Sequence, residues 1–207
     1  LTGCWDQMQL RHLKLVDIAG IDIDEKSGNI VLQYVVTSLK KPGQGGGESN
    51  SEVTALKGPS LVEAVSESEY IDRAPFLGVN TRIYAISKSF ASHDPVPKLN
   101  FLLQAPYAAI NAPLVVFDGS ISKILKTNVK NKKEFTNLLY EFVSSLEKNG
   151  IMSNVTLMRF IQSNKDPLED IALPLLKQSD SENVELNGAI LFRQGTNTGV
   201  NLSKEQV

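Results

Sequence analysis

The stretch Leu13–Leu39, LKLVDIAGIDIDEKSGNIVLQYVVTSL, carries the clearest secondary-structure signal in the chain. Its two ends, Leu13–Ile23 and Ile30–Leu39, are rich in isoleucine, valine and leucine, which favours strands. The segment between them, Asp24–Asn29 (DEKSGN), has the polar residues and the glycine of a turn. We therefore expect the fold to open with an antiparallel hairpin.

The segment after this hairpin contains a glycine-rich stretch and a helix signal. Lys41–Glu52 (KPGQGGGESNSE) is expected to be a flexible loop, because glycine and small polar residues cannot pack a core. A short strand is predicted at Val53–Leu56. Ser60 and Glu63 then have the spacing of a capping box, which predicts a helix that runs to about Ile71.

The remaining chain mixes strand and helix signals and belongs to the α+β class, with mixed, mainly antiparallel sheets and flanking helices. We expect antiparallel pairs rather than an alternating βαβ chain. The first part is predicted to contain a strand at Thr81–Phe90, an interruption at Pro95 and Pro97, a short helix at Leu99–Gln104 and an apolar central strand at Pro113–Phe117. The middle part is predicted to contain helical turns at Ser120–Lys126, a helix at Lys132–Lys148 that ends at Gly150, and a strand or helix at Val155–Gln162. The last part is predicted to contain an apolar segment at Leu168–Lys177 and a strand at Val184–Gln194, which a turn at Gly195–Gly199 joins to a partner strand at Val200–Leu202.

Composition limits the function classes. The 207 residues carry a net charge of -2, so bulk charge indicates no polyanionic partner such as a nucleic acid. No apolar run reaches the roughly 18 residues that a membrane span needs. Membrane association would therefore require an anchor or a surface patch. We expect three parts: a tether at residues 1–9, an α+β domain at 10–126, and a more helical region at 127–207 that ends in a β-hairpin.

Metal-site motifs are missing from the sequence. The two histidines, His12 and His93, have no metal-ligand spacing with each other or with the lone cysteine. The strongest carboxylate cluster, at 22–25, fails the calcium-loop pattern, because Ser27 stands at the sixth position and Gln33 at the twelfth. The cluster is interpreted as a strand end and its turn.

Motifs for catalysis or nucleotide binding are missing as well. The glycines at 43–47 are followed by Glu48, which would repel phosphate, and no Lys-Ser/Thr pair follows as in a P-loop. No Gly-x-Ser-x-Gly element of a serine hydrolase is present. We therefore predict no enzyme activity, no catalytic residue and no cofactor.

Cys4 is the only cysteine, so no internal disulfide can form. It ends the tetrapeptide Leu1-Thr2-Gly3-Cys4 (LTGC), which has the pattern of a bacterial lipobox. In that interpretation the Cys4 thiol carries diacylglycerol through a thioether bond. The position beside the chain start favours attachment over burial, because chain ends rarely reach a core. The alternative is an accidental cysteine in a disordered start.

A lysine-rich segment is the most notable charge feature. Within eleven residues that include no acid lie five lysines, Lys123, Lys126, Lys130, Lys132 and Lys133. Such a segment could contact anionic headgroups or an acidic partner. The alternative, which we favour, is a solvated loop and helix surface.

Several segments, in this order, together resemble the Ger(x)C family, the C subunits of nutrient germinant receptors. They are LTGCWD at 1–6, VDIAGID at 16–22, KGPSLVEA at 57–64, PLVV at 113–116 with ISKIL at 121–125, and LNGAILF at 186–192. The resemblance implies a lipoprotein on the outer face of the spore inner membrane, assembled with polytopic A and B subunits. It carries over one functional residue, Cys4, and implies a further C-terminal domain.

These observations give two main hypotheses. The first is a non-enzymatic receptor subunit that acts in germination through receptor assembly or signal relay. The second is an extracytoplasmic solute-binding lipoprotein of an importer, a class that usually has two α/β lobes built on parallel sheets. An extracytoplasmic enzyme is disfavoured by the missing motifs.

Overall fold

A computed structural model describes residues 14–39, 49–71, 76–77, 81–105, 108–131, 134–179 and 183–207. The predicted tether at 1–9, including Cys4, lies outside these residues, and so does most of the predicted glycine-rich loop. Lys132 and Lys133 also lie outside them, and the side chain of Lys130 is not described.

The described residues form three strands, then a mixture of strands and helices, and finally three more strands. The strands are β1 (Lys14–Ile23), β2 (Ile30–Leu39), β3 (Ser49–Gly58), β4 (Phe76–Leu77), β5 (Ile83–Ser87), β6 (Leu114–Phe117), β7 (Asp170–Gln178), β8 (Val184–Arg193) and β9 (Thr196–Leu202). The helices are α1 (Leu61–Ile71), α2 (Lys88–Ala91), α3 (Pro95–Leu99), α4 (Ile121–Asn131), α5 (Phe135–Lys148) and α6 (Leu157–Gln162), with 3₁₀ turns η3 (Asn100–Leu103) and η4 (Ser163–Lys165).

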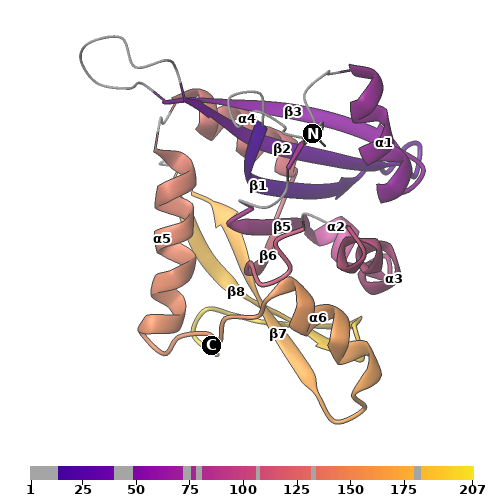
Figure 1. Ribbon diagram of the computed structural model, residues 1–207. Helices are drawn as coiled ribbons and strands as arrows, with labels where there is room; N and C mark the ends of the chain where they lie inside the picture. Colours follow the sequence, from indigo (N-terminus) through magenta and orange to yellow (C-terminus); the bar gives the residue numbers. More distant parts are fainter. Residues whose placement is uncertain are drawn as a thin grey trace, which may run out of the picture.

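One mixed sheet joins these strands in the order β3-β2-β1-β5-β6-β7-β8-β9, and the short β4 pairs with β1 beside this path (Figure 1). The outer pairs β1–β2, β2–β3, β7–β8 and β8–β9 are antiparallel, whereas β1–β5, β5–β6 and β6–β7 are parallel. The α+β class with a mixed sheet is confirmed. The parallel centre differs from the expected antiparallel pairing, because helices rather than turns connect β5 to β6 and β6 to β7.

The opening hairpin has the predicted bounds almost to the residue. β1 and β2 pair antiparallel from Ile23 opposite Ile30 to Leu15 opposite Thr37. The third strand is longer than predicted, because β3 pairs with β2 along its full length. Residues 49–52, which were expected in the loop, therefore belong to the sheet.

Two local predictions were wrong at the end of β5. The predicted strand Thr81–Phe90 ends at Ser87, whose hydroxyl accepts a hydrogen bond from the Phe90 N–H at 2.9 Å and so caps α2. Pro95 and Pro97 do not interrupt the chain but lie in the first turn of α3. Proline is tolerated there because the N–H groups of a first helical turn have no partner within the helix.

Other predictions agree with the structure. Leu114–Phe117 is fully buried and central in the sheet, as expected from its apolar run. The Ser60 hydroxyl accepts the Glu63 N–H at 3.2 Å and donates to the Glu63 carboxylate at 2.8 Å, as a capped helix start requires. The expected division at residue 126 stays a prediction: that residue lies within α4, and strands from both sides of it belong to the same sheet.

Helices cover both faces of the sheet and form two hydrophobic cores. On one face α1, α2, α3 and α6 pack on the sheet, with Leu61, Phe90, Val96, Leu99, Phe160 and Ile161 fully or almost fully buried. On the other face α4 and α5 supply Ile121, Ile124, Leu125, Val129, Phe135, Leu139, Val143 and Leu146. The sheet is therefore the middle of three layers (Figure 1).

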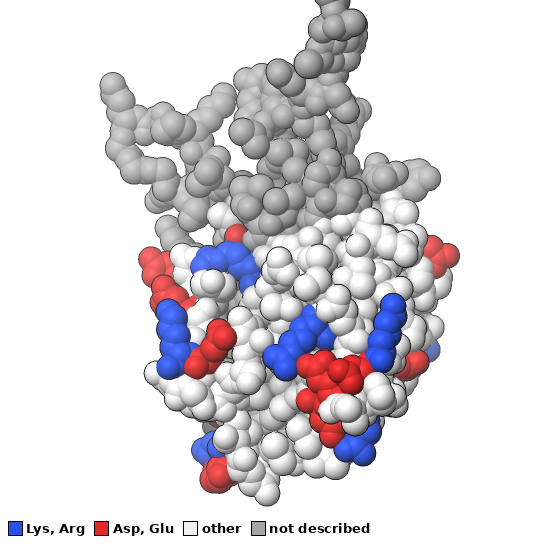
Figure 2. Space-filling model, turned by 60° about the horizontal axis from the view of Figure 1, so that its bottom comes forward, with Lys and Arg blue, Asp and Glu red and all other residues white. Residues whose placement is uncertain are grey.

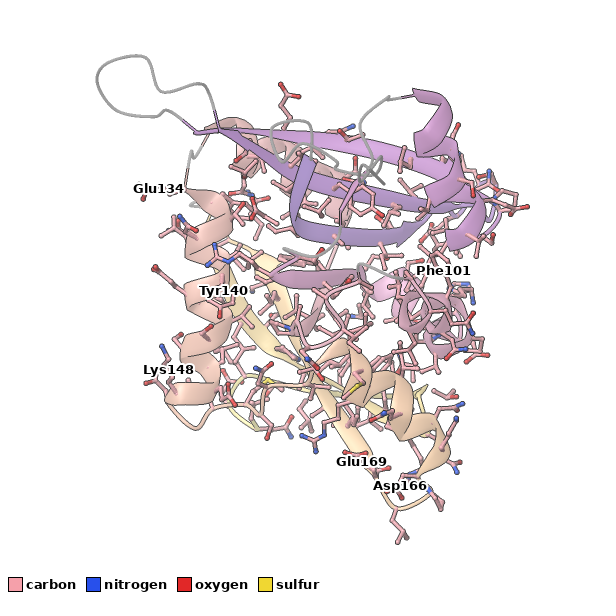
Figure 3. The ribbon with its side chains drawn as sticks, viewed as in Figure 1. Phe101, Glu134, Tyr140, Lys148, Asp166 and Glu169 are labelled. Atoms are coloured by element: carbon pink, nitrogen blue, oxygen red, sulfur yellow. The ribbon has the colours of Figure 1, made fainter. Side chains whose placement is uncertain are left out.

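A contact at the start of β5 fixes the middle of α5. The Arg82 guanidinium lies 4.2 Å from the centre of the Tyr140 ring, and it donates a hydrogen bond of 2.5 Å to the Asn137 carboxamide. Figure 3 shows Tyr140 between Glu134 and Lys148, which mark the two ends of the helix. This contact thus links the residue before β5 to α5, a helix of the connection between β6 and β7.

Gly20 sets how closely α4 approaches β1. A Cβ atom on Gly20 would lie 2.5 Å from Cγ2 of Ile121 and 3.0 Å from Cδ1 of Leu125. Real Cβ atoms essentially never approach other atoms as closely as 2.5 Å, so with any larger residue the Ile121 side chain or the helix that carries it would have to shift. Glycine is therefore required here by packing and not by its backbone angles.

We predict that Gly20→Ala lowers the free energy of unfolding by about 1–3 kcal/mol, the usual cost of overpacking. Urea unfolding should show a smaller cost of Gly20→Ala in an Ile121→Ala background, since the contacted methyl group is then absent. Equal costs in both backgrounds would contradict the proposed contact.

Candidate functional site

A cleft of about 600 Å³ lies at the edge of the sheet where the central strands end. Ten residues line it, and they follow or end three neighbouring parallel strands: Asp22, Ile23 and Glu25 from β1, Ser87, Lys88, Ser89, Ser92 and His93 from β5, and Gly119 and Ser120 from β6. The carboxyl ends of parallel strands thus form its floor.

The chain leaves this edge in opposite directions. After β5 it enters α2 and α3 on one face of the sheet, and after β6 it enters α4 on the other face. Where connections from adjacent parallel strands separate in this way, a crevice opens between them, and open α/β sheets bind their ligands there. The topology therefore supports this cleft as the candidate site.

Carboxylates form the β1 wall of the cleft. Asp22 Oδ1 accepts the N–H of Ile23 at 2.8 Å, and the Ser89 hydroxyl donates to Glu25 Oε1 at 3.4 Å. The third acid of the cluster, Asp24, faces Lys57 at the end of β3 and forms an ion pair with it. The carboxylate cluster does lie at a strand end and its turn, as predicted, but two of its members also face the cleft.

Basic and hydroxyl groups form the opposite walls. Lys88 Nζ lies 3.9 Å from Asp118 Oδ1, and His93 Nδ1 lies 2.7 Å from the carbonyl oxygen of Ser89. The hydroxyl of Ser120 accepts the N–H of Lys123 at 3.4 Å, so it caps the start of α4 beside the cleft. The first turn of α4 contains no acidic residue.

This site was not predicted from the sequence. The acids at 22–25 stand out in the sequence, but nothing in it relates them to Lys88 or Ser120, which lie far along the chain. The available signal was that a polar segment follows each of the apolar strands β1, β5 and β6. That signal indicates a site only when these strands are known to be parallel neighbours.

The predicted lysine segment lies elsewhere. Lys123 and Lys126 are exposed on α4, whose opposite side buries Ile121 and Leu125 against the sheet. The structure therefore describes a lysine-bearing side of α4, and its predicted contact with membrane or partner remains a proposal.

The face that comes forward in Figure 2 carries its charges differently. Positive and negative side chains lie next to each other there, with uncharged surface between them. Two ion pairs at the start of β7 also join neighbouring charges of opposite sign. They are Arg159–Glu169 at 2.9 Å and Arg193–Asp170 at 2.6 Å. Arg193 holds the pKa of the Asp170 carboxyl below its ordinary value through their hydrogen bond.

The described residues contain neither a membrane-spanning helix nor a cluster of metal-binding side chains. No helix in that part of the chain is both long and apolar enough to cross a bilayer. Among the same residues, no group of three or more histidine, cysteine, aspartate or glutamate side chains is placed to hold a metal ion.

The pH dependence of stability should reveal the Asp24–Lys57 pair. The Lys57 side chain, followed by the N–H of Lys26, lowers the pKa of Asp24 from 3.8 to about 2. A lowered pKa in the folded state means that the pair stabilises the fold above pH 3.8 and that this contribution is lost as the pH falls to about 2. Thermal unfolding should therefore show a deficit for Asp24→Asn above pH 3.8 that disappears near pH 2. A deficit that does not change across this interval would contradict the assignment, and Lys57→Met should mimic Asp24→Asn.

Comparison with known proteins identifies the family of this fold. Residues 6–178 match the family model described as the spore germination protein N-terminal domain. The "Putative spore germination protein YfkR" of Bacillus subtilis (strain 168) is 19% identical over 206 residues, which cover 94% of this chain and 53% of that protein. The chain thus spans about half the length of this curated relative. No solved structure matches it. Because the family model covers most of the chain, the protein belongs to the spore germination protein N-terminal domain family.

Proposed function

We propose that the protein is a non-enzymatic lipoprotein subunit of a nutrient germinant receptor that acts in receptor assembly or signal relay. The observation that carries this proposal is the family match over residues 6–178, which supports a role in spore germination. In this proposal the chain stands on the outer face of the spore inner membrane, beside the A and B membrane subunits of the receptor. The similarity of the chain to the Ger(x)C subunits, noted above, supplies these partners.

A lipid on Cys4 is the proposed anchor. Support comes from the LTGC sequence at residues 1–4 and from its distance to the fold, since β1 begins at Lys14. Nine residues lie between Cys4 and Lys14. A fully extended chain of that length reaches roughly 30 Å, so the lipid would keep the sheet close to the bilayer.

The proposed anchor implies an orientation. Leu15 pairs with Thr37, so the start of β1 lies at the edge where β2 ends, opposite to the cleft edge at Ile23. Figure 1 places the end of α4 and the beginning of α5 at this same amino edge. The carboxyl-terminal half of α4, which contains Lys126, would then lie nearest the membrane, and the cleft would face away from it.

The importer alternative receives less support. A solute-binding lipoprotein of that class usually closes two lobes around its ligand. The described strands instead form one sheet with helices on both faces. The germination function is therefore the one we propose.

We predict that Cys4→Ala releases the protein from membranes. Two acyl chains give stable anchoring, whereas a chain without them has only weak electrostatic contacts. Membrane fractionation should be done in cells that lack the A and B subunits, so that partners cannot retain the mutant. Cys4→Ser is the conservative control and should behave in the same way. Persistence of either variant in the membrane fraction would show that the anchor is not Cys4.

We further predict that changing Lys126, Lys130 and Lys133 together to Gln weakens receptor assembly at low ionic strength. Each lysine near an anionic surface contributes roughly 1 kcal/mol, and salt screens this contribution. Co-purification with the A and B subunits measures the effect. The triple change of Lys148, Lys165 and Lys204 to Gln is the matched control, because it removes the same charge from other parts of the surface. Equal assembly of both variants and the parent would show that the segment is only a solvated surface.

A further inference from the structure

Two carboxamides are buried between α4 and the sheet without the hydrogen bonds that buried amides need. The side chain of Gln33 is fully buried, and neither its nitrogen nor its oxygen has a partner among the described residues. On α4, Asn128 is 1% exposed, and its Oδ1 has no partner in that part of the chain either. An unpaired buried amide opposes folding about as strongly as the burial of one aliphatic side chain favours it.

Gln33 lies on the face of the sheet that α4 covers. Its partner in the β1–β2 pair is Gly20, which lies under Ile121 and Leu125 of α4. Paired residues of antiparallel strands point to the same face, so the Gln33 side chain also points toward the α4 layer. The helix contacts β1, β2 and β3. Gln33 and Asn128 therefore belong to one helix–sheet interface.

The two halves of α4 are held differently. In the first half, Ile121, Ile124 and Leu125 are at most 5% exposed. In the second half, residues 127–131 with the sequence TNVKN, the buried side chains among those described are Val129 and Asn128. Threonine, asparagine and valine are weak helix formers, and α4 contains no acidic residue that could pair with its lysines. The second half thus has little apolar burial to offset the unpaired amides.

Gln33 is also close to solvent. Its partner in the β2–β3 pair is Ala55, which shares its face and is exposed. The helix layer therefore covers Gln33 but leaves the next position on the edge strand uncovered. A small outward movement of the second half of α4 would let water reach both carboxamides, and among the described side chains it would expose Val129 as the one buried apolar group of that half.

We propose that residues 127–131 are a hinged segment of α4, which opens from the sheet and closes again while the first half stays in place. The first half is retained by its buried side chains and by the close approach of Ile121 to Gly20. A partner that offers hydrogen bonds to Gln33 would bind the open state better and would shift the equilibrium toward it. The segment is thus a switch that such a partner can operate.

Amide hydrogen exchange of the ¹⁵N-labelled chain, followed by nuclear magnetic resonance, tests the proposal. Opening breaks the helical hydrogen bonds of the segment, so the amides of Asn128 and Val129 should exchange at least about 10-fold faster than that of Leu125. Gln33→Met removes the unpaired carboxamide and should slow exchange at these two amides about 5-fold or more. Gln33→Glu buries a charge in the closed state and should speed exchange there. Neither variant should change the exchange of Leu125.

Ser163→Ala is the matched control, because its hydroxyl is also buried but donates to the Phe160 carbonyl oxygen at 2.7 Å. It should not slow exchange in α4. The proposal is overturned if the two amides of the segment are protected as well as that of Leu125, a comparison that stands even if a variant fails to fold. It is also overturned if Gln33→Met speeds their exchange, leaves it unchanged or alters it equally at Leu125. None of these outcomes bears on the proposed anchor at Cys4.

Discussion

The parallel pairing of β1 with β5 is the constraint on which the rest of the structure depends. It brings Ile18 opposite Ile83 and Ile21 opposite Ile86, although the residues of each pair lie 65 positions apart in the sequence. This pairing attaches the opening three-stranded meander to the parallel centre, so that each of the two cores extends across both parts of the sheet. It also gives the sheet two different edges, since the chain enters the parallel strands at one edge and turns into helices at the other.

The helix α4 spans the distance between these two edges. It begins at the cleft and ends near the opposite edge of the sheet, where β1 starts (Figure 1), and its 11 residues extend for about 16 Å. The buried side of α4 includes Asn128, whose Oδ1 has no hydrogen-bond partner among the described residues. The helix lies over β1 and β2, where the buried carboxamide of Gln33 also has no partner among the described residues. Leaving such a group unpaired costs about 1–3 kcal/mol. The attachment of α4 to the sheet thus combines a close approach at Gly20 with two buried polar side chains, Asn128 and Gln33.

Local features were predictable from the sequence because local chemistry determines them. The hairpin Leu13–Leu39, the capped start of α1 at Ser60 and the buried strand at Pro113–Phe117 all follow from patterns within a few residues. The parallel centre was not predictable, because β5 and β6 are short and no nearby residue reports which strand lies beside them. The cleft depends on that pairing, so its residues were recognised only in part, as a carboxylate cluster without its basic partners.

In the proposed orientation, the amino edge of the sheet faces the membrane and the cleft faces away from it. Paramagnetic relaxation measured on the lipidated chain in nanodiscs, with spin labels at the bilayer surface, tests this most directly. We expect the labels to broaden the amide signals of Lys126 and Lys130 strongly and to leave those of Ser89 and Gly119 sharp. Strong broadening at Ser89 and Gly119, with sharp signals at Lys126 and Lys130, would contradict the orientation.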